Sequence, residues 1–474
     1  MTDSSPYRTP ESPPSQPPGR WQQWQRRLQV NAAVMWAVAT RIWQVGAGGV
    51  SFLMLASFMT ADETGYYFTF WSLIAAQSLV DMGFTIAILN FSSHEWSELG
   101  LDDAGRIVGN SQSLSRLASL SRLAFAWFGI GMVLFAIGAG VVGEVVLGSG
   151  DSSTIDWRTP WLILIVLSAL SLWVMPFLSI LEGCGQIETV YRFRFLQAVA
   201  MNCTVWGSLW AGLGIWTAVA SAATKLATEL LLLLIRYRSF FRSLYRSTSD
   251  SVVNWRQQIW PMQWRLAVGG IFNYFAVFMF SPVMFHHSES LAGRMGMTRQ
   301  LLMALQGGAQ SWVQARVPLF GQLVAQRKYS ELDEVFRRLT LISTLVLLTG
   351  GAVFLGLLVL LPDYAPRLSD RLLPVLPTAL MLLAMIAFQL PYCQTLYLRA
   401  HRQEPVMWAT VASNIGIALG VAGLGLLYAA TGAAVGHLLA VVLITVPMIH
   451  RVWVRCRREW HNDAGEETVE PSTD

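Results

Sequence analysis

The chain has 474 residues, of which 54% are hydrophobic and only 13% are charged. A soluble domain has about 25% charged residues, and the mean hydropathy of +0.45 is typical of a membrane protein. The composition therefore excludes an ordinary soluble protein and predicts an all-α polytopic membrane protein. We expect no nucleic acid partner.

The two ends of the chain differ from the apolar middle. The first 20 residues contain six prolines and no apolar run, which predicts a disordered cytoplasmic tail rather than a signal peptide. The segment WQQWQRRLQ at 21–29 combines Trp and Arg, so we expect an interfacial helix over 21–30. The acidic end predicts a second cytoplasmic tail over 455–474.

Twelve apolar segments follow one another along the chain. A helix needs about 20 apolar residues to cross roughly 30 Å of hydrocarbon. The segments that meet this requirement are 33–59, 66–91, 118–142, 160–181, 194–213, 214–235, 260–285, 293–320, 339–361, 372–397, 406–428 and 432–453. They predict twelve transmembrane helices.

The basic residues fix the predicted orientation of these spans. Seven loops or tails on one side of the predicted membrane carry 24 of the 33 basic residues. The loops on the other side contain only Arg158, Arg367 and Arg371. Lys and Arg are enriched in short cytoplasmic loops, so we expect both termini to be cytoplasmic.

The two halves of the chain resemble each other in register. Polar residues in the second span have counterparts 229 positions later in the eighth span, pairing Gln77, Asp81 and Thr85 with Gln306, Gln310 and Gln314. Spacings of four residues predict one polar face on each helix. Chance matches between apolar helices are the alternative. We expect a 6+6 repeat, with an N-terminal lobe at 31–236, a cytoplasmic linker at 237–259 and a C-terminal lobe at 260–454.

Ionisable residues inside the predicted spans are the candidates for function, because burying them in a membrane is unfavourable. Six cations and two anions lie in or near the spans, and a cationic cavity would attract an anion such as phosphate. We predict a substrate cavity lined by Arg41, Arg265, Arg299, Lys225, Gln306 and Gln310. Asp81 and Glu229 are the predicted coupling or counter-charge residues.

Each of these residues has a structural alternative. Arg41 and Asp81 lie about 12 and 15 Å from the inner ends of their spans at 1.5 Å per residue, so they can form either a structural ion pair or part of the cavity. Arg41 and Arg265 can also reach the headgroups. Lys225 and Glu229 are four residues apart, which favours a structural pair but leaves substrate binding or proton coupling open. Arg299 and the glutamines of the eighth span fit a water-facing surface or a buried hydrogen-bonded seam.

Motifs for hydrolysis or metal binding are absent from the sequence. There is no HExxH, no Walker A lysine loop, no GxSxG and no paired Cys/His cluster. We therefore expect no catalytic residues, no metal and no cofactor, and a protein that is not an enzyme.

Two segments resemble a known family. The stretch ETGYYFTFWSLIAAQSLVDMGFTIAILNFSSHEW at 63–96 and the run that begins GRMGMTRQLLMALQGGAQSW at 293 are similar to spans 2 and 8 of bacterial flippases for O-antigen and other lipid-linked oligosaccharides. These flippases belong to the multidrug/oligosaccharidyl-lipid/polysaccharide (MOP) exporter superfamily.

The resemblance implies a V-shaped pair of six-helix lobes around a cationic cavity in the bacterial inner membrane. The implied substrate is an undecaprenyl-pyrophosphate-linked oligosaccharide, which is moved to the outer leaflet by alternating access. The cavity arginines of the family correspond here to Arg41, Arg265 and Arg299. Further partners are membrane lipids and polysaccharide polymerase or assembly proteins.

Three rival functions fit the sequence less well. A cation-coupled multidrug exporter of the same superfamily would favour buried carboxylates, whereas Arg is in excess here. A facilitator of the other common 6+6 class would have a Gly-Asp-Arg-Gly signature, which FSSHEWSELGLDDAGR does not match. A polytopic glycosyltransferase or polymerase needs a larger outside loop than any in this chain.

Overall fold

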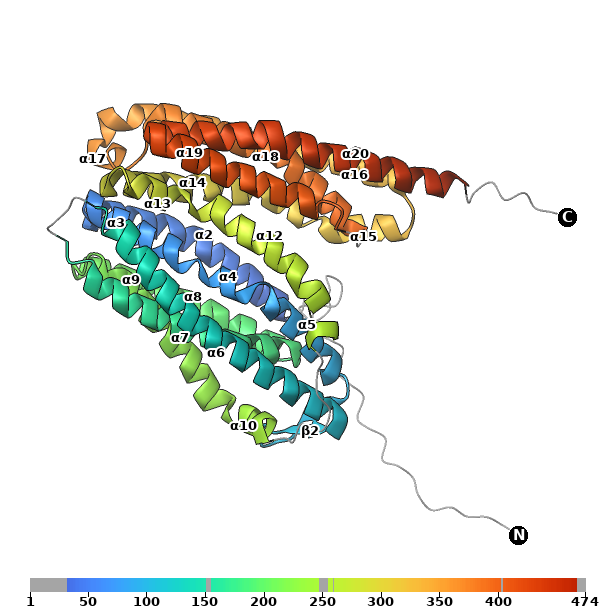
Figure 1. Cartoon of the computed structure of the whole chain (residues 1–474). Helices are drawn as coiled ribbons and strands as arrows, with labels where there is room; N and C mark the ends of the chain where they lie inside the picture. Colours follow the sequence, from blue (N-terminus) through green and yellow to red (C-terminus); the bar gives the residue numbers. More distant parts are fainter. Residues whose placement is uncertain (1–31, 151–154, 247–254, 259, 402–403, 467–474) are drawn as a thin grey trace, which may run out of the picture.

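The computed structural model describes residues 32–150, 155–246, 255–258, 260–401 and 404–466. The predicted N-terminal tail and the interfacial helix at 21–30 lie outside these residues. The described chain is built of helices with one two-stranded sheet (Figure 1).

The N-terminal half begins with a long helix and a broken one. Its elements are α2 (Ala32–Phe58), α3 (Ala61–Ile74), α4 (Gln77–Asp81), α5 (Phe84–Trp96), β1 (Leu99–Leu101), β2 (Ile107–Gly109), α6 (Ser111–Leu147), α7 (Arg158–Gly183), α8 (Ile187–Trp210), α9 (Trp216–Leu231) and the π-helix η1 (Leu232–Arg236). Thr60 and Glu63 form a capping box that starts α3.

The C-terminal half follows a linker that holds α10 (Arg238–Arg246) and α11 (Trp255–Gln258). Its elements are α12 (Trp260–Phe278), α13 (Phe280–Phe285), α14 (Glu289–Gln314), α15 (Val317–Ala325), α16 (Tyr329–Tyr364), α17 (Pro366–Ser369), α18 (Val375–Ala400), α19 (Met407–Ala440), the π-helix η2 (Val441–Thr445) and α20 (Val446–Glu466). Tyr428 and Ala429 have non-helical torsion angles, so α19 is two helices joined at a kink.

The two halves meet at one end of the molecule and diverge towards the other (Figure 1). They meet where α3 packs on α14 and lie apart where α10 and α15 lie. The contact depends on Gly65, because a Cβ there would lie 1.9 Å from the Glu289 carbonyl oxygen. Arg371 crosses between the halves and donates a hydrogen bond to the carbonyl of Met59.

Helix α12 connects the two halves. It packs against α19 in its own half and also against α4 of the other half. The Tyr274 hydroxyl donates a hydrogen bond of 3.3 Å to the carbonyl oxygen of Ser72 in α3. One side of the molecule is therefore held together by α12, in addition to the contact between α3 and α14.

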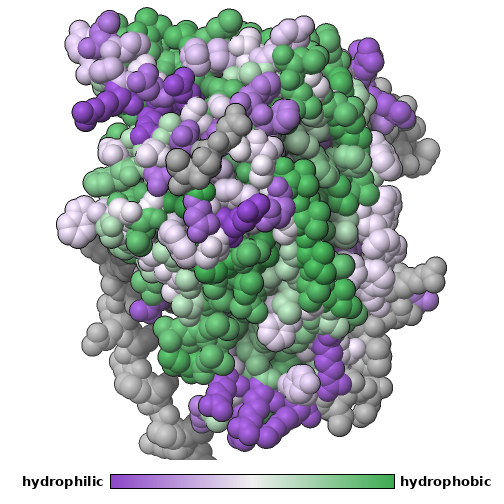
Figure 2. Space-filling model, turned by 60° about the vertical axis from the view of Figure 1, so that its left-hand side comes forward, coloured by the Kyte–Doolittle hydropathy of each residue, from purple (hydrophilic) through white to green (hydrophobic). Residues whose placement is uncertain are grey.

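Hydrophobic side chains cover continuous areas of the surface between hydrophilic patches (Figure 2). Exposed residues include Val45, Val145 and Ile235, which are 79%, 71% and 74% exposed. Seven helices among the described residues are long and apolar enough to cross a membrane, and an eighth results if the bent unit α3–α5 counts as one span. This confirms a multi-pass helical membrane protein, whereas the count of twelve spans in two lobes of six stays a prediction.

The second predicted span is not the continuous helix that the spacing of its polar residues implies. Met82 and Gly83 have φ angles of 45° and 71° and break it between α4 and α5. Glycine is needed at 83, because a Cβ there would lie 2.6 Å from Leu266 of α12. The prediction that Thr85 shares one unbroken helix face with Gln77 and Asp81 is therefore wrong.

Ordered structure also occurs where a loop, linker or tail was predicted. The hairpin β1–β2 lies between α5 and α6, and the backbone N–H of Arg106 lowers the pKa of Asp102 in its turn. The linker helix α10 buries Phe240 and Leu244. Helix α20 continues past 454 into the predicted tail, because Arg457 pairs with Asp333 of α16.

Candidate functional site

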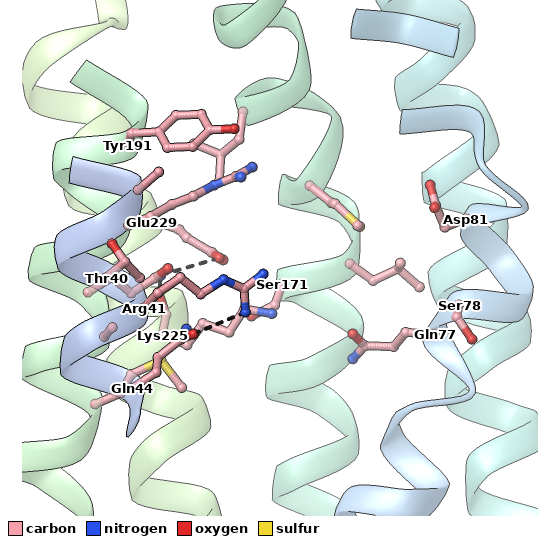
Figure 3. Close-up of a pocket in the computed structure, with 18 of the residues that line it drawn as sticks. Thr40, Arg41, Gln44, Gln77, Ser78, Asp81, Ser171, Tyr191, Lys225 and Glu229 are labelled. Carbon is pink, nitrogen blue, oxygen red and sulfur yellow. Dashed lines mark hydrogen bonds between the residues drawn. The ribbon is translucent and has the colours of Figure 1, made fainter. Parts of the chain in front are cut away.

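A cavity of 1190 Å³ lies within the N-terminal half. It extends from the first turns of α8, at Ile187 and Tyr191, to Met201 on the same helix, a distance of about 21 Å along the helix axis. Two groups of helices form its walls, with α2, α8 and α9 on one side and α4 on the other (Figure 3). Helix α7 contributes Ser171 between them.

Helix α2 contributes Arg41 to the cavity. Its guanidinium is exposed and donates one long hydrogen bond of 3.5 Å to Gln44, one turn further on. In the described part of the chain, no carboxylate lies within ion-pair distance of Arg41. The charge of Arg41 is therefore available to a ligand in the cavity.

Helix α9 contributes Lys225 and Glu229, which do not form the ion pair that their spacing predicts. Glu229 is buried, and its Oε1 accepts a hydrogen bond of 3.4 Å from Gln197 of α8. The same amide donates to the Lys225 carbonyl oxygen at 3.2 Å. Gln197 thus holds α8 against α9, while the ammonium group of Lys225 has no ion pair among the described residues.

Asp81 lines the cavity from the wall opposite Arg41 (Figure 3). Its carboxylate accepts hydrogen bonds from the backbone N–H of Thr85 at 3.1 Å and from the Thr85 hydroxyl at 3.2 Å. The first of these bonds satisfies one backbone N–H in the first turn of α5, directly after the break. The structural ion pair of Arg41 with Asp81, one of the two alternatives left open by the sequence, does not form, because Asp81 accepts hydrogen bonds from Thr85 on the opposite wall.

Two cavity residues were missed as candidates by the sequence analysis. Arg194 is the first residue of the fifth predicted span and was counted only among the basic residues of the preceding cytoplasmic loop, but it lines the cavity and pairs with Glu182 of α7. Gln197 is the hydrogen-bonding partner of Glu229. On α8, cavity residues recur at 187, 191, 194, 198 and 201, a helical spacing of three and four that would have identified this face.

The predicted site residues of the C-terminal half do not line this cavity. The guanidinium of Arg299 lies 4.1 Å from the ring centre of Phe280 and donates a hydrogen bond of 2.6 Å to the Val277 carbonyl oxygen. Arg265 is exposed and lies 5.7 Å from the Trp264 ring. The structure therefore brings Arg41, Lys225, Asp81 and Glu229 together and leaves Arg265 and Arg299 elsewhere.

Gln306 and Gln310 are half-buried on α14, also outside the cavity. The third residue of the predicted polar stripe, Gln314, donates a hydrogen bond of 2.5 Å to the Tyr392 hydroxyl of α18. At Gln314 the stripe thus forms a contact between helices, which was the structural alternative. Among the described residues, no group of three His, Cys, Asp or Glu side chains is placed to hold a metal ion.

Solved membrane transporters have a similar fold. The lipid II flippase MurJ in an inward closed conformation aligns with a TM-score of 0.61 and 10% identity over 93% of this chain and 94% of that chain. An inward-facing multidrug resistance MATE family transporter of the MOP superfamily gives 0.58 and 12% over 90% and 99%. A eukaryotic MATE transporter gives 0.52 and 12% over 94% and 99%. No family model and no curated protein matches the chain.

The chain therefore has a fold similar to that of these transporters. Membership of the MOP superfamily stays a prediction. The resemblance to O-antigen flippases in particular stays a prediction, because the similar structures include both a lipid flippase and drug exporters.

Proposed function

We propose that the protein is a transporter which moves a diphosphate-linked lipid oligosaccharide across a bacterial inner membrane without chemically altering it. Twelve spans in two lobes of six would alternate between inward-open and outward-open arrangements, with both termini in the cytoplasm. The substrate class is an undecaprenyl-pyrophosphate-linked oligosaccharide, such as an O-antigen unit.

One observation carries this proposal: Arg41 and Lys225 line the cavity with no carboxylate of the described residues within ion-pair distance, whereas both acidic residues of the cavity accept hydrogen bonds from protein groups. Arg41 offers a planar fork that matches phosphate oxygens, and Lys225 adds a second positive charge. The cavity is therefore better suited to an anionic headgroup than to a cationic drug.

The physical role of such a cavity is to replace water around the headgroup. A diphosphate with a polar glycan loses its hydration in hydrocarbon, and this loss is unfavourable unless other polar groups replace the water. Charge-assisted hydrogen bonds from Arg41 and Lys225 would provide this replacement. The polyprenyl chain would stay in the surrounding lipid.

A flipping assay tests the proposal. The purified chain is reconstituted in liposomes with a fluorescent, short-chain polyprenyl-diphosphate sugar, and the label that reaches the outer leaflet is measured by chemical quenching. We expect flipping by the wild type and none above background by the Arg41→Ala/Lys225→Ala variant. Equal rates for both proteins would contradict the proposal.

Cation-coupled drug export is the second candidate, and one observation favours it. The Oε2 atom of the Glu229 carboxylate is buried without a hydrogen-bond partner in a residue that lines the cavity, as a group that binds a proton or an organic cation would be. Uptake of a fluorescent organic cation into the same liposomes separates the two candidates. Uptake that depends on Glu229, combined with no lipid flipping, would favour the exporter.

A further inference from the structure

A second cavity lies in the C-terminal half and does not belong to the site described above. It has a volume of 760 Å³ and lies between α16, α18 and α20. Helix α16 lines it with residues from Ser330 to Thr344, α18 contributes Leu390, and α20 contributes Trp453 and Arg457.

The face of α16 in this cavity changes from polar to apolar along the helix. Glu334, Arg337 and Leu341 follow one another at spacings of three and four residues and therefore share one face. Leu341 is 59% exposed, and Leu345 and Leu348 continue the exposed apolar surface. A polar end that continues into an exposed apolar strip matches the polarity of a phospholipid, which has a headgroup at one end and acyl chains at the other.

One ion pair at the polar end is already complete. The guanidinium of Arg457 donates to both carboxylate oxygens of Asp333, with its Nε 3.0 Å from Oδ2, and the Tyr397 hydroxyl donates to Oδ1 at 3.0 Å. Arg457 also lies 5.4 Å from the centre of the Trp453 ring, which stacks on Phe336. This assembly has no net charge and joins α20 to α16 at the polar end of the cavity.

Two further charges of opposite sign lie near this ion pair. Glu334 and Arg337 are both exposed and line the cavity. The described residues provide neither side chain with an ion pair or a hydrogen bond. A single ligand that pairs with both side chains would carry a cation and an anion close together.

We propose that this cavity binds the zwitterionic phospholipid phosphatidylethanolamine. Its ammonium group would donate hydrogen bonds to Glu334, its phosphate would accept them from Arg337, and an acyl chain would lie along Leu341 and Leu390. The quaternary ammonium of phosphatidylcholine has no N–H to donate, and the anionic headgroup of phosphatidylglycerol has no cation for Glu334. The inference is independent of which substrate the N-terminal cavity transports.

Native mass spectrometry of the full-length protein tests the proposal. The delipidated protein is titrated with phosphatidylethanolamine, phosphatidylcholine and phosphatidylglycerol of identical acyl chains. Loss of a charge-assisted hydrogen bond corresponds to about a tenfold change in affinity. We therefore expect phosphatidylethanolamine to bind about tenfold more tightly than the other two lipids, and Glu334→Gln or Arg337→Gln to remove this preference.

Arg338→Gln is the matched control, because Arg338 is exposed on the same helix but does not line the cavity. We expect this variant to keep the preference, and unfolding temperatures measured without added lipid will show that all variants are folded. Equal binding of the three lipids, stronger binding of phosphatidylglycerol, or an equal loss in Arg338→Gln would overturn the proposal.

Discussion

Arg41 and Arg299 are both arginines on predicted membrane spans, but their guanidinium groups have different surroundings. Arg41 lines a large cavity and has one long hydrogen bond to a neutral amide. Arg299 donates to a backbone carbonyl oxygen at 2.6 Å and lies against an aromatic ring. The N-terminal half thus leaves a cation free for a ligand, while the C-terminal half uses one to join α14 to α12 and α13.

The difference shows that an intramembrane arginine is not by itself evidence of a binding site. The charge must be compensated, and the protein can do this with its own carbonyl groups and rings or leave it to a ligand. The neighbours of each arginine therefore decide its role. Substitutions at the two positions should have opposite consequences for transport and stability.

Arg41→Ala is expected to have the largest effect. Charge-assisted hydrogen bonds contribute about 1.5–3 kcal/mol each, and 1.4 kcal/mol is a factor of ten. Loss of a forked contact to phosphate should therefore reduce lipid flipping in liposomes by about 100-fold, with an unchanged unfolding temperature. Arg41→Lys should be intermediate, because it keeps the charge but loses the fork.

The control is Arg192→Ala. Arg192 lies near the start of α8, and its guanidinium is 5.8 Å from the Trp36 ring of α2, the helix that carries Arg41. It does not line the cavity. We expect near wild-type flipping from this variant. If both alanine variants lose activity equally, the free cation at 41 has no special role.

Arg299→Ala should mainly reduce stability. It removes a charge-assisted hydrogen bond and a cation–π contact, which together correspond to about 2 kcal/mol. We expect a lower unfolding temperature in detergent, followed by tryptophan fluorescence, and unchanged affinity for the diphosphate lipid. A large loss of affinity at unchanged stability would place Arg299 at the ligand instead.

Asp81→Ala is expected to have the smallest effect of the three. It removes the acceptor for Thr85 at the start of α5, and loss of such a cap reduces stability by about 1 kcal/mol. Asp81→Asn keeps one acceptor oxygen and should lose less in the same unfolding measurement. A fall in flipping rate without any change in stability would instead assign Asp81 to transport.

The fold was predictable from the sequence to the extent that hydropathy determines it. Apolar length and basic loops predicted a multi-pass helical protein, and the segments at 63–96 and from 293 onwards pointed to transporters with a fold similar to the one that the chain has. The break at Met82 and Gly83 was not predicted, because the packing of Leu266 against Gly83 is a contact between distant parts of the chain.

The candidate site was predictable only in its N-terminal half. Arg41, Lys225, Asp81 and Glu229 were selected as ionisable residues within spans, and all four line one cavity. Their partners were not predictable, because Gln197 reaches Glu229 from a neighbouring helix. The same reasoning selected Arg299, since the sequence does not reveal that a carbonyl group and a ring already compensate its charge.

Equilibrium binding of a fluorescent diphosphate-linked lipid to the purified protein tests most directly whether unpaired cations in the N-terminal cavity hold the substrate. For the Arg41→Ala/Lys225→Ala variant we predict an affinity at least about 100-fold below wild type, and for Arg299→Ala an affinity equal to wild type. Wild-type affinity in the double variant, at any salt concentration, would contradict the account.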